Sequence, residues 1–395
     1  MRNKVELLAP AGSPEGIRAA VQSGAGAVYM GFGMFNARRN AQGFSHDEMA
    51  DVIAYCRARD VKTNITLNIL AGDRELEDAL EDAKFLYEAG ADALIVQDLG
   101  LARLIHAHAP DFALHASTQM TIHTLDAAKQ ARDIGFSRVV LSRECSREEI
   151  KLITEQAGVE TEVFVHGALC MCYSGQCYLS AVIGQRSGNR GLCAQPCRLP
   201  YSGGYPLSLK DLMLAGHVAE LSDWGVSSLK IEGRMKTALY VATVARTYRK
   251  AIDDYLESPE KYEANMPWYL EQIKSCTYRQ FTTGFFYGKP SEETQIYDNN
   301  TYEKGYTYLG IVGAPNEKGL YRMEQRNKFS VGEQIEIMKP NGDNVLATVL
   351  ALVDEDGNEM ESCPHPQQIF YVKLSETPDE FDILRRQENE AIALD

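Results

Sequence analysis

The chain has 395 residues and a formal net charge of −15, with 45% hydrophobic and 24% charged residues. This length predicts two or three domains, and the composition is that of a globular protein. No apolar run is long enough to span a bilayer and the N-terminus lacks a signal-peptide core, so we expect a cytoplasmic protein without a membrane partner. The acidic charge argues against DNA binding, although a local basic patch could still face an RNA.

Short apolar runs alternate with amphipathic stretches through the first two thirds of the chain. The amphipathic stretches begin near Ser or Asp and end near Gly, as helices do. This alternation predicts an α/β fold, a (β/α)8 TIM-like barrel over residues 1–262. A doubly wound open sheet is the alternative, but no GxGxxG motif follows the first run. The predicted strands are residues 5–10, 27–32, 62–68, 93–98, 113–118, 138–143, 161–167 and 227–233.

The connection after the seventh predicted strand is much longer than the others. It spans residues 168–209, here called the cysteine loop, and a helix is predicted after it over residues 211–225. Barrel active sites are built from the loops that follow the strands, so we expect this loop to be functional. It contains five of the nine cysteines: Cys170, Cys172, Cys177, Cys193 and Cys197.

The last third of the chain has a different pattern. A helix over residues 237–258 completes the barrel, and residues 263–300 are predicted to form a helical connector. Residues 301–395 contain short strand-like runs separated by turns, which predicts a small C-terminal all-β domain. Such a domain could bind RNA or protein, or only pack against the barrel.

Four cysteines of the loop form two spaced pairs, Cys170-x6-Cys177 and Cys193-x3-Cys197. Cytoplasmic thiols stay reduced, so metal binding is favoured over disulfides. Thiolates bind both zinc and iron–sulfur clusters, and the wide spacing favours a cluster over the tighter pairs typical of zinc. A zinc knuckle in a non-catalytic binding module, or free thiols, are the alternatives. The isolated cysteines are expected to pack in the core: Cys56, Cys145, Cys276 and Cys363.

The run from Glu162 to Ser180 reads E-x-F-x-x-G-A-L-C-x4-G-x-C-x-L-S. It resembles the signature of peptidase family U32, the collagenase-like proteins. The segments ELLAPAG, NRGLCAQPCR, SLKDL and SLKIEGR extend the resemblance over most of the chain. The chain is therefore identified as a member of this family.

The resemblance implies two kinds of activity. The family is named for collagen degradation, whereas better-understood relatives add hydroxyl groups to RNA bases or to ubiquinone without oxygen, and carry a 4Fe-4S cluster on four cysteines. One branch converts the tRNA wobble uridine to 5-hydroxyuridine and depends on prephenate. We expect this activity, with tRNA as substrate, prephenate as co-substrate and a paralogous family member as a candidate partner. Hydroxylation of a 23S rRNA cytidine and peptidase activity are the alternatives.

The cluster ligands follow from the same resemblance. Cys170, Cys177 and Cys193 match ligand positions of the relatives. The fourth ligand differs among relatives, and we expect Cys197 because the later candidate region, KIEGR, has no cysteine. Cys172 is the possible substitute.

His166 ends the seventh predicted strand and is expected to point to the barrel mouth beside Cys170. The two side chains could then act as base and nucleophile. This arrangement competes with the cluster, because one thiol cannot easily serve both purposes. The chain has no HExxH or GxSxG motif, which argues against a metalloprotease or a serine hydrolase.

Several polar residues lie at predicted strand ends and are expected to share one rim. Arg143, Lys230 and Arg234 are predicted to clamp a dicarboxylate such as prephenate, because guanidinium groups bind carboxylates through two parallel hydrogen bonds. Glu232 and Glu144 would carry protons or neutralise these cations. The other strand-end residues are Asn68, Gln97, Asp98, His115, Ser117 and Gln119, of which His115 and Gln119 are predicted to bind substrate.

A basic crescent around the mouth is predicted to contact RNA. Tyr173 and Tyr178 could stack on an unpaired base. Scattered surface charges and core aromatic side chains are the alternative interpretation. The basic candidates are Arg38, Arg39, Arg186, Arg190, Arg198 and Lys236.

Overall fold

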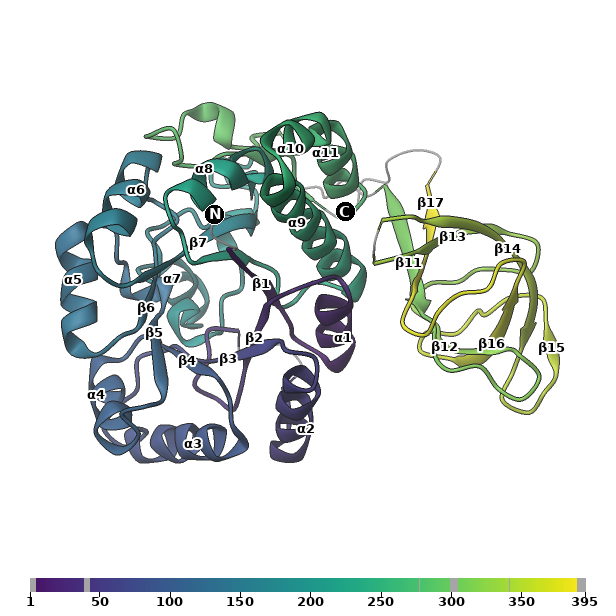
Figure 1. Cartoon of the computed structure of the whole chain (residues 1–395), viewed down its shortest axis with the longest axis horizontal. Helices are drawn as coiled ribbons and strands as arrows, with labels where there is room; N and C mark the ends of the chain where they lie inside the picture. The colour runs from purple at the N-terminus through teal and green to yellow at the C-terminus, as the bar shows by residue number, and fades with distance from the viewer. Residues whose placement is uncertain (1–4, 39–42, 277, 299–304, 341, 389–395) are drawn as a thin grey trace.

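The computed structural model describes residues 5–38, 43–276, 278–298, 305–340 and 342–388, so Arg39 lies outside the described residues. Within this part of the chain, eight parallel strands form a closed barrel, because β9 pairs with both β1 and β7 (Figure 1). The predicted (β/α)8 barrel is confirmed. Its strands are β1 (Glu6–Pro10), β2 (Ala27–Gly31), β3 (Lys62–Leu67), β4 (Ala93–Val96), β5 (Ala113–Ala116), β6 (Arg138–Val140), β7 (Glu160–Ala168) and β9 (Ser228–Ile231).

The barrel helices alternate with the strands and surround them. Two of them, α2 and α6, begin with a capping box. The hydroxyls of Ser45 and Ser146 each accept a hydrogen bond from the amide of the third helical residue, a glutamate, whose carboxylate accepts from the amide of the serine. This arrangement satisfies free amide groups at the helix start. The helices are α1 (Pro14–Gln22), α2 (His46–Arg57), α3 (Leu76–Ala89), α4 (Leu99–His108), α5 (Leu125–Ile134), α6 (Arg147–Gln156), α8 (Val218–Asp223) and α9 (Ala238–Glu257).

The helix predicted over residues 211–225 is wrong in its first half. Residues Asp211–Met213 form a short strand, β8, which pairs antiparallel with the end of β7, and only α8 is α-helical. β7 is nine residues long and extends beyond its neighbours β6 and β9, so its last residues offer unpaired backbone groups. The amide of Leu214 also donates to the Val165 carbonyl over 2.8 Å. Strand pairing has therefore overridden the local helix preference.

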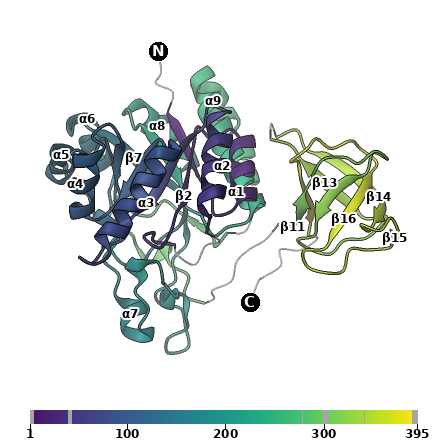
Figure 2. The same cartoon turned by 90° about the horizontal axis from the view of Figure 1, so that it is seen from below.

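The cysteine loop contains the short helix α7 (Leu179–Gly184), which projects beyond the carboxyl ends of the barrel strands (Figure 2). After α9 follow α10 (Pro259–Ala264) and α11 (Met266–Lys274), and then the two-residue strand β10 (Phe281–Thr282), which pairs with β8. No helix in the described residues is both long enough and apolar enough to cross a membrane.

A separate antiparallel sheet with its own core forms the C-terminal domain, as predicted. It lies beside α1 and α9 (Figure 1). Polar contacts bind it to the barrel, and its residues Tyr308, Met338 and Ile383 pack into the hydrophobic core of the barrel. Arg326 pairs with Glu15 of α1, and Arg246 of α9 donates to the Lys339 carbonyl over 2.7 Å. In the described residues its strands are β11 (Tyr306–Ile311), β12 (Tyr321–Glu324), β13 (Gln334–Met338), β14 (Val345–Val353), β15 (Glu359–Met360), β16 (Ile369–Leu374) and β17 (Ile383–Gln387).

Candidate active site

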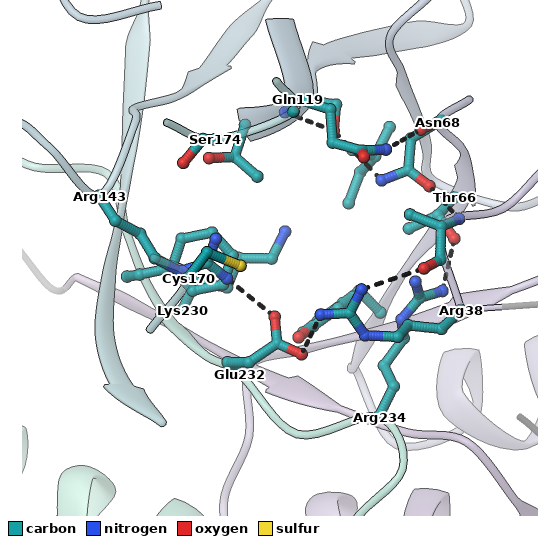
Figure 3. A pocket seen from close by; sticks show the side chains of 17 residues that line it. Arg38, Thr66, Asn68, Gln119, Arg143, Cys170, Ser174, Lys230, Glu232 and Arg234 are labelled. Atoms are coloured by element: carbon teal, nitrogen blue, oxygen red, sulfur yellow. Dashed lines mark hydrogen bonds and ion pairs between the residues drawn. The ribbon is translucent and has the colours of Figure 1, made fainter. Parts of the chain in front are cut away.

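A cavity opens at the carboxyl ends of the barrel strands, beneath the cysteine loop (Figure 3). It offers about 80 Å³ to the centre of a water-sized molecule, whereas one water needs only about 10–15 Å³. The space therefore suits a small organic molecule. The described residues that line it are Tyr29, Ala37, Arg38, Thr66, Asn68, Ile95, Ser117, Thr118, Gln119, Arg143, Phe164, Cys170, Ser174, Gly175, Lys230, Glu232 and Arg234.

Glu232 lies between two arginines at one wall of the cavity (Figure 3). Its Oε2 atom is 2.9 Å from Nη2 of Arg143, and its Oε1 atom is 3.4 Å from Nη2 of Arg38. Burial alone would raise the pKa of Glu232, but the charges of Arg38, Arg143, Arg234 and Lys230 outweigh it, so the pKa lies below its ordinary value. The carboxylate is therefore ionised at neutral pH and acts as an acceptor, not as a proton donor.

The backbone of Glu232 is held against the end of β7. Its amide donates to the His166 carbonyl over 2.8 Å, and its carbonyl accepts from the Tyr240 hydroxyl over 3.0 Å. A Cβ atom on Gly167 would lie only 2.6 Å from the Glu232 carbonyl oxygen. Glycine at position 167, which also has a φ of 107°, is thus what allows this close approach.

Lys230 forms the floor of the cavity. Its Nζ atom is 2.8 Å from Oε1 of Glu162 and 4.2 Å from the centre of the Tyr29 ring, and all three side chains are buried. Glu162 also accepts from Arg138 at 3.2 Å. Burial alone would raise the pKa of Glu162, yet Lys230 and Arg138 hold it below its ordinary value. The buried ion pair with Glu162 thus fixes the Lys230 ammonium group in place.

Arg234 occupies a different part of the wall. Its Nη1 atom donates to the Thr66 hydroxyl over 2.7 Å, and no described carboxylate lies within ion-pair distance of it. Burial lowers the pKa of Arg234 to about 10, so the group stays charged at neutral pH. A Cβ atom on Gly12 would lie 1.9 Å from the Arg234 carbonyl oxygen, so only glycine lets the loop after β1 pass here.

The cysteine loop covers the cavity and is fixed at several points. Ser174 donates to Glu144 through both its amide and its hydroxyl, each over 3.1 Å, and its carbonyl accepts from Thr121 over 2.7 Å. Arg190 pairs with Glu75 at 2.6 Å, which attaches the loop to the segment after β3. The buried Arg198 donates to the Leu169 carbonyl over 3.1 Å and so joins the two ends of the loop.

The thiols of the cysteine loop influence one another electrostatically. Burial raises the pKa of Cys197, Arg198 lowers it, and the charges of Cys170, Cys193 and Cys177 raise it again, so these four sulfurs lie within electrostatic range. Cys172 hydrogen-bonds with Cys177, and burial followed by this contact raises its pKa to about 11. Among the described residues, no three or more His, Cys, Asp or Glu side chains are close enough to hold a single metal ion.

The expected position of His166 is wrong. Its ring is buried against the rings of Tyr240, Tyr248 and Phe281, and its Nδ1 atom is 3.4 Å from the Tyr248 hydroxyl. The register of β7 on β9 shifts between Phe164 and His166, so this β-bulge breaks the alternation that would have turned His166 into the barrel. Burial lowers its pKa to about 3. His166 is therefore a neutral packing residue that does not line the cavity.

His115 is also not at the rim. It is buried inside the barrel, where burial and then the charge of Arg138 lower its pKa to about 3. Glu144 does not line the cavity but holds Ser174, which does. Asp98 caps α4 by accepting from the Leu101 amide over 2.9 Å. These three residues support the barrel and the loop.

The described residues that were predicted to contact RNA divide into three groups. Arg38 lines the cavity and pairs with Glu232, and Lys236 lies over the Tyr240 ring, with its Nζ atom 5.1 Å from the ring centre. Arg186, Tyr173 and Tyr178 are exposed on the cysteine loop, so they remain available to a large ligand. Arg190 is engaged with Glu75, and Arg198 is buried and cannot reach an RNA.

Eight lining residues were not predicted, and they include Tyr29, Thr66, Phe164 and Ser174. The first three occupy inward positions of β2, β3 and β7, and the period-two alternation of strands was the signal that could have identified them. Ser174 has no local signal, because it reaches the cavity only through the fold of the cysteine loop.

The fold and the site together define a class of protein. It is a (β/α)8 barrel whose active-site face holds a cavity lined by four cations and roofed by a thiol-rich loop, among the residues described.

The chain belongs to peptidase family U32. The model of this family matches residues 12–296, and the model of the U32 C-terminal domain matches residues 304–385. A tRNA hydroxylation protein of Bacillus subtilis is 36% identical, over 94% of this chain and 92% of that protein. A tRNA hydroxylation protein of Escherichia coli is 32% identical, over 91% and 92%. A 23S rRNA 5-hydroxycytidine synthase of Escherichia coli is 41% identical, over 88% of this chain but 52% of that protein.

We expect Glu162→Gln to destabilise the barrel by about 3 kcal/mol, because it removes one partner of a buried charge pair. The matched control, Glu155→Gln, breaks an exposed pair with Lys151 and should cost less than about 0.5 kcal/mol. Urea unfolding followed by fluorescence of Trp224 and Trp268 measures both.

The pH dependence provides a second check. The folded-state pKa of Glu162 is lowered, so its stabilising effect is present above the unfolded value of about 4.3 and is lost as the pH falls through the folded value. The difference between wild type and Glu162→Gln should therefore be constant from about pH 6 to 8 and narrow below about pH 4. A difference that is absent at neutral pH would contradict the assigned ion pair.

Proposed function

We propose that this protein hydroxylates a base of an RNA, and that the base is the wobble uridine of tRNA, converted to 5-hydroxyuridine. The observation that carries the proposal is the similarity to the Bacillus subtilis tRNA hydroxylation protein, which covers 94% of this chain and 92% of that protein. Hydroxylation of a 23S rRNA cytidine is the second candidate. It is favoured by the higher identity to the rRNA synthase, although this chain spans only 52% of that protein.

The cavity supports a small anionic co-substrate, which we propose to be prephenate. Among the described lining residues, four cations face one carboxylate, a surplus of three positive charges; Glu162 beneath Lys230 reduces it to two. A dicarboxylate carries two negative charges and would balance this surplus. Arg143 and Arg234 each have donor atoms in the cavity wall, and a guanidinium group binds a carboxylate through two parallel hydrogen bonds.

Glu232 would orient the arginines in this scheme. It is ionised and in contact with Arg38 and Arg143, so it holds their guanidinium groups in place and can accept a proton during the reaction. Gln119 lines the opposite side of the cavity and fixes its own position through a hydrogen bond to the Asn68 carbonyl. Lys230 provides a fixed positive charge at the floor.

The thiols of the cysteine loop fit a 4Fe-4S cluster by the chemistry of the donor set, since four thiolates are the usual ligands. Cys170, Cys177, Cys193 and Cys197 would hold it, and Cys172 is the alternative to Cys197. Such a cluster supplies electron transfer or Lewis-acid chemistry at the roof of the cavity. Cys170, which also lines the cavity, would connect the two parts of the site.

The structure does not support the nucleophile–base pair of Cys170 and His166 on which the peptidase alternative relied. A cysteine nucleophile needs a base within hydrogen-bonding reach, whereas His166 is enclosed by Tyr240, Tyr248 and Phe281. The RNA substrate would meet the exposed side of the loop, at Tyr173 and Arg186. A reaction on tRNA would take place in the cytoplasm, and a paralogous family member stays a candidate partner.

Nucleoside mass spectrometry of a strain that lacks the gene tests the substrate. We expect 5-hydroxyuridine in tRNA to disappear, and to return with wild type and with the control Arg132→Met, whose arginine pairs with Asp133 on the surface. Arg143→Met should restore about a tenth or less, since losing hydrogen bonds to a charged group costs about 1.5–3 kcal/mol. Loss of 5-hydroxycytidine from 23S rRNA instead would favour the second candidate, and persistence of both bases would refute the proposal.

Iron and acid-labile sulfide analysis after anaerobic purification tests the cluster. Wild type should contain about four of each per chain. Cys170→Ala, Cys193→Ala and Cys197→Ala should lose most of both, whereas Cys172→Ala and the buried control Cys145→Ala should keep them. A loss of iron and sulfide in Cys172→Ala but not in Cys197→Ala would show that Cys172, and not Cys197, is the fourth ligand. One zinc per chain without iron would refute the cluster.

A further inference from the structure

The cysteine loop and the residues next to it, 163–167 and 210, differ in charge from the rest of the chain. Residues 163–210 contain no Asp or Glu in 48 positions, although 55 acidic residues in 395 predict about seven. The same segment contains three arginines and one lysine. Arg190 pairs with Glu75 and Arg198 is buried, so Arg186 is the exposed arginine of the three. In a protein of net charge −15, a polyanion is repelled by most of the surface and accepted here. This charge complementarity suits a polyanion such as RNA as the occupant of the loop.

The helix α7, in the part of this loop that projects from the barrel, carries large apolar side chains that face solvent. Val182 is 79% exposed, Ile183 is 56% exposed and Tyr178, which precedes the helix, is 69% exposed. Single exposed apolar residues are ordinary, but three within six positions at a projecting tip (Figure 2) form a concentrated contact surface. Arg186 follows directly and is exposed as well.

The tip is held on a fixed base. Ser180 is buried, and its hydroxyl accepts from the Ala194 amide over 3.0 Å. Gln185 ends α7 with a φ of 54°, a conformation that non-glycine residues adopt infrequently, and its amide donates to the Ala181 carbonyl over 2.9 Å. The apolar side chains are therefore presented on a pre-shaped turn.

The cavity is deep, so a target base has to be held out of its stack before it can enter. Lys230 at the floor and Arg234 in the wall are only 3% and 6% exposed. A base stacked within an RNA loop cannot reach this depth, so it has to leave its stack. Proteins that unstack nucleic acids commonly insert an apolar side chain into the space that opens.

We propose that Val182 and Ile183 form a wedge that inserts beside the target nucleotide of a single-stranded RNA loop and holds its base out of the stack, towards the cavity. This inference rests on the proposed RNA substrate. Arg186 would contact the adjacent phosphate, and Tyr178 would stack on a neighbouring base.

A stem-loop RNA that carries 2-aminopurine next to the target uridine tests the wedge, because the fluorescence of 2-aminopurine rises when it loses its stacking partner. We expect wild type to increase the fluorescence at saturation, and Val182→Ala/Ile183→Ala to lose most of this increase. The variant should still bind within about tenfold of the wild-type Kd, because its phosphate contacts remain. The control, Leu346→Ala/Leu350→Ala on β14, removes equally exposed side chains and should behave as wild type.

The outcomes separate the wedge from the proposed function. A full fluorescence increase with the Val182→Ala/Ile183→Ala variant would overturn the wedge while leaving the RNA substrate in place. A wild-type protein that binds no RNA stem-loop would overturn both. A wild type that self-associates in sedimentation, and a variant that does not, would show instead that the tip contacts a second copy of the chain. Unchanged thermal unfolding of both variants verifies that they are folded.

Discussion

The arrangement of the whole site depends on one carboxylate placed among four cations. Glu232 follows β9, the strand that closes the barrel, and its backbone is attached to β7 through the His166 carbonyl. Its side chain is shared by Arg38 and Arg143, which come from the loops after β2 and β6. Buried guanidinium groups are tolerated only when they are paired or hydrogen-bonded. The carboxylate therefore makes it possible to collect so much positive charge in one small cavity.

The remaining positive charge sets the chemistry that the cavity can accept. Lys230 has its own partner in Glu162, and Arg234 relies on Thr66. The surplus can be balanced by an anion from solution, and this agrees with the dicarboxylate that we propose. In our proposal the RNA would meet a different surface, the cysteine loop, which contains no Asp or Glu. The small and the large reactant would then approach the site from its inner and outer sides.

The sequence predicted a residue's position correctly where that position follows from the strand order and from the alternating side-chain direction along a strand. Eight apolar runs were sufficient to predict the barrel, and because strand ends share a rim, Arg143, Lys230, Glu232 and Arg234 were correctly expected together. His166 was misplaced because a β-bulge reverses the side-chain direction at one residue, and no sequence pattern marks that bulge.

Other errors came from long-range pairing. Residues 211–213 form a strand because β7 extends beyond its neighbours, which is a property of the assembled barrel and not of the segment itself. Glu144, Arg190 and Arg198 had the residue types expected of catalytic or RNA-binding groups. Their partners, which include Ser174, are distant in sequence or lie within the folded loop, so their bracing function became visible only in three dimensions.

Calorimetric titration of the anaerobically purified protein with prephenate tests the assignment of the cavity most directly. We expect wild type and Arg132→Met to bind one molecule per chain with the same Kd. Arg143→Met should bind at least about tenfold more weakly, since hydrogen bonds to a charged group contribute about 1.5–3 kcal/mol. Equal affinity of wild type and Arg143→Met, or no binding by either, would contradict a dicarboxylate site among these arginines.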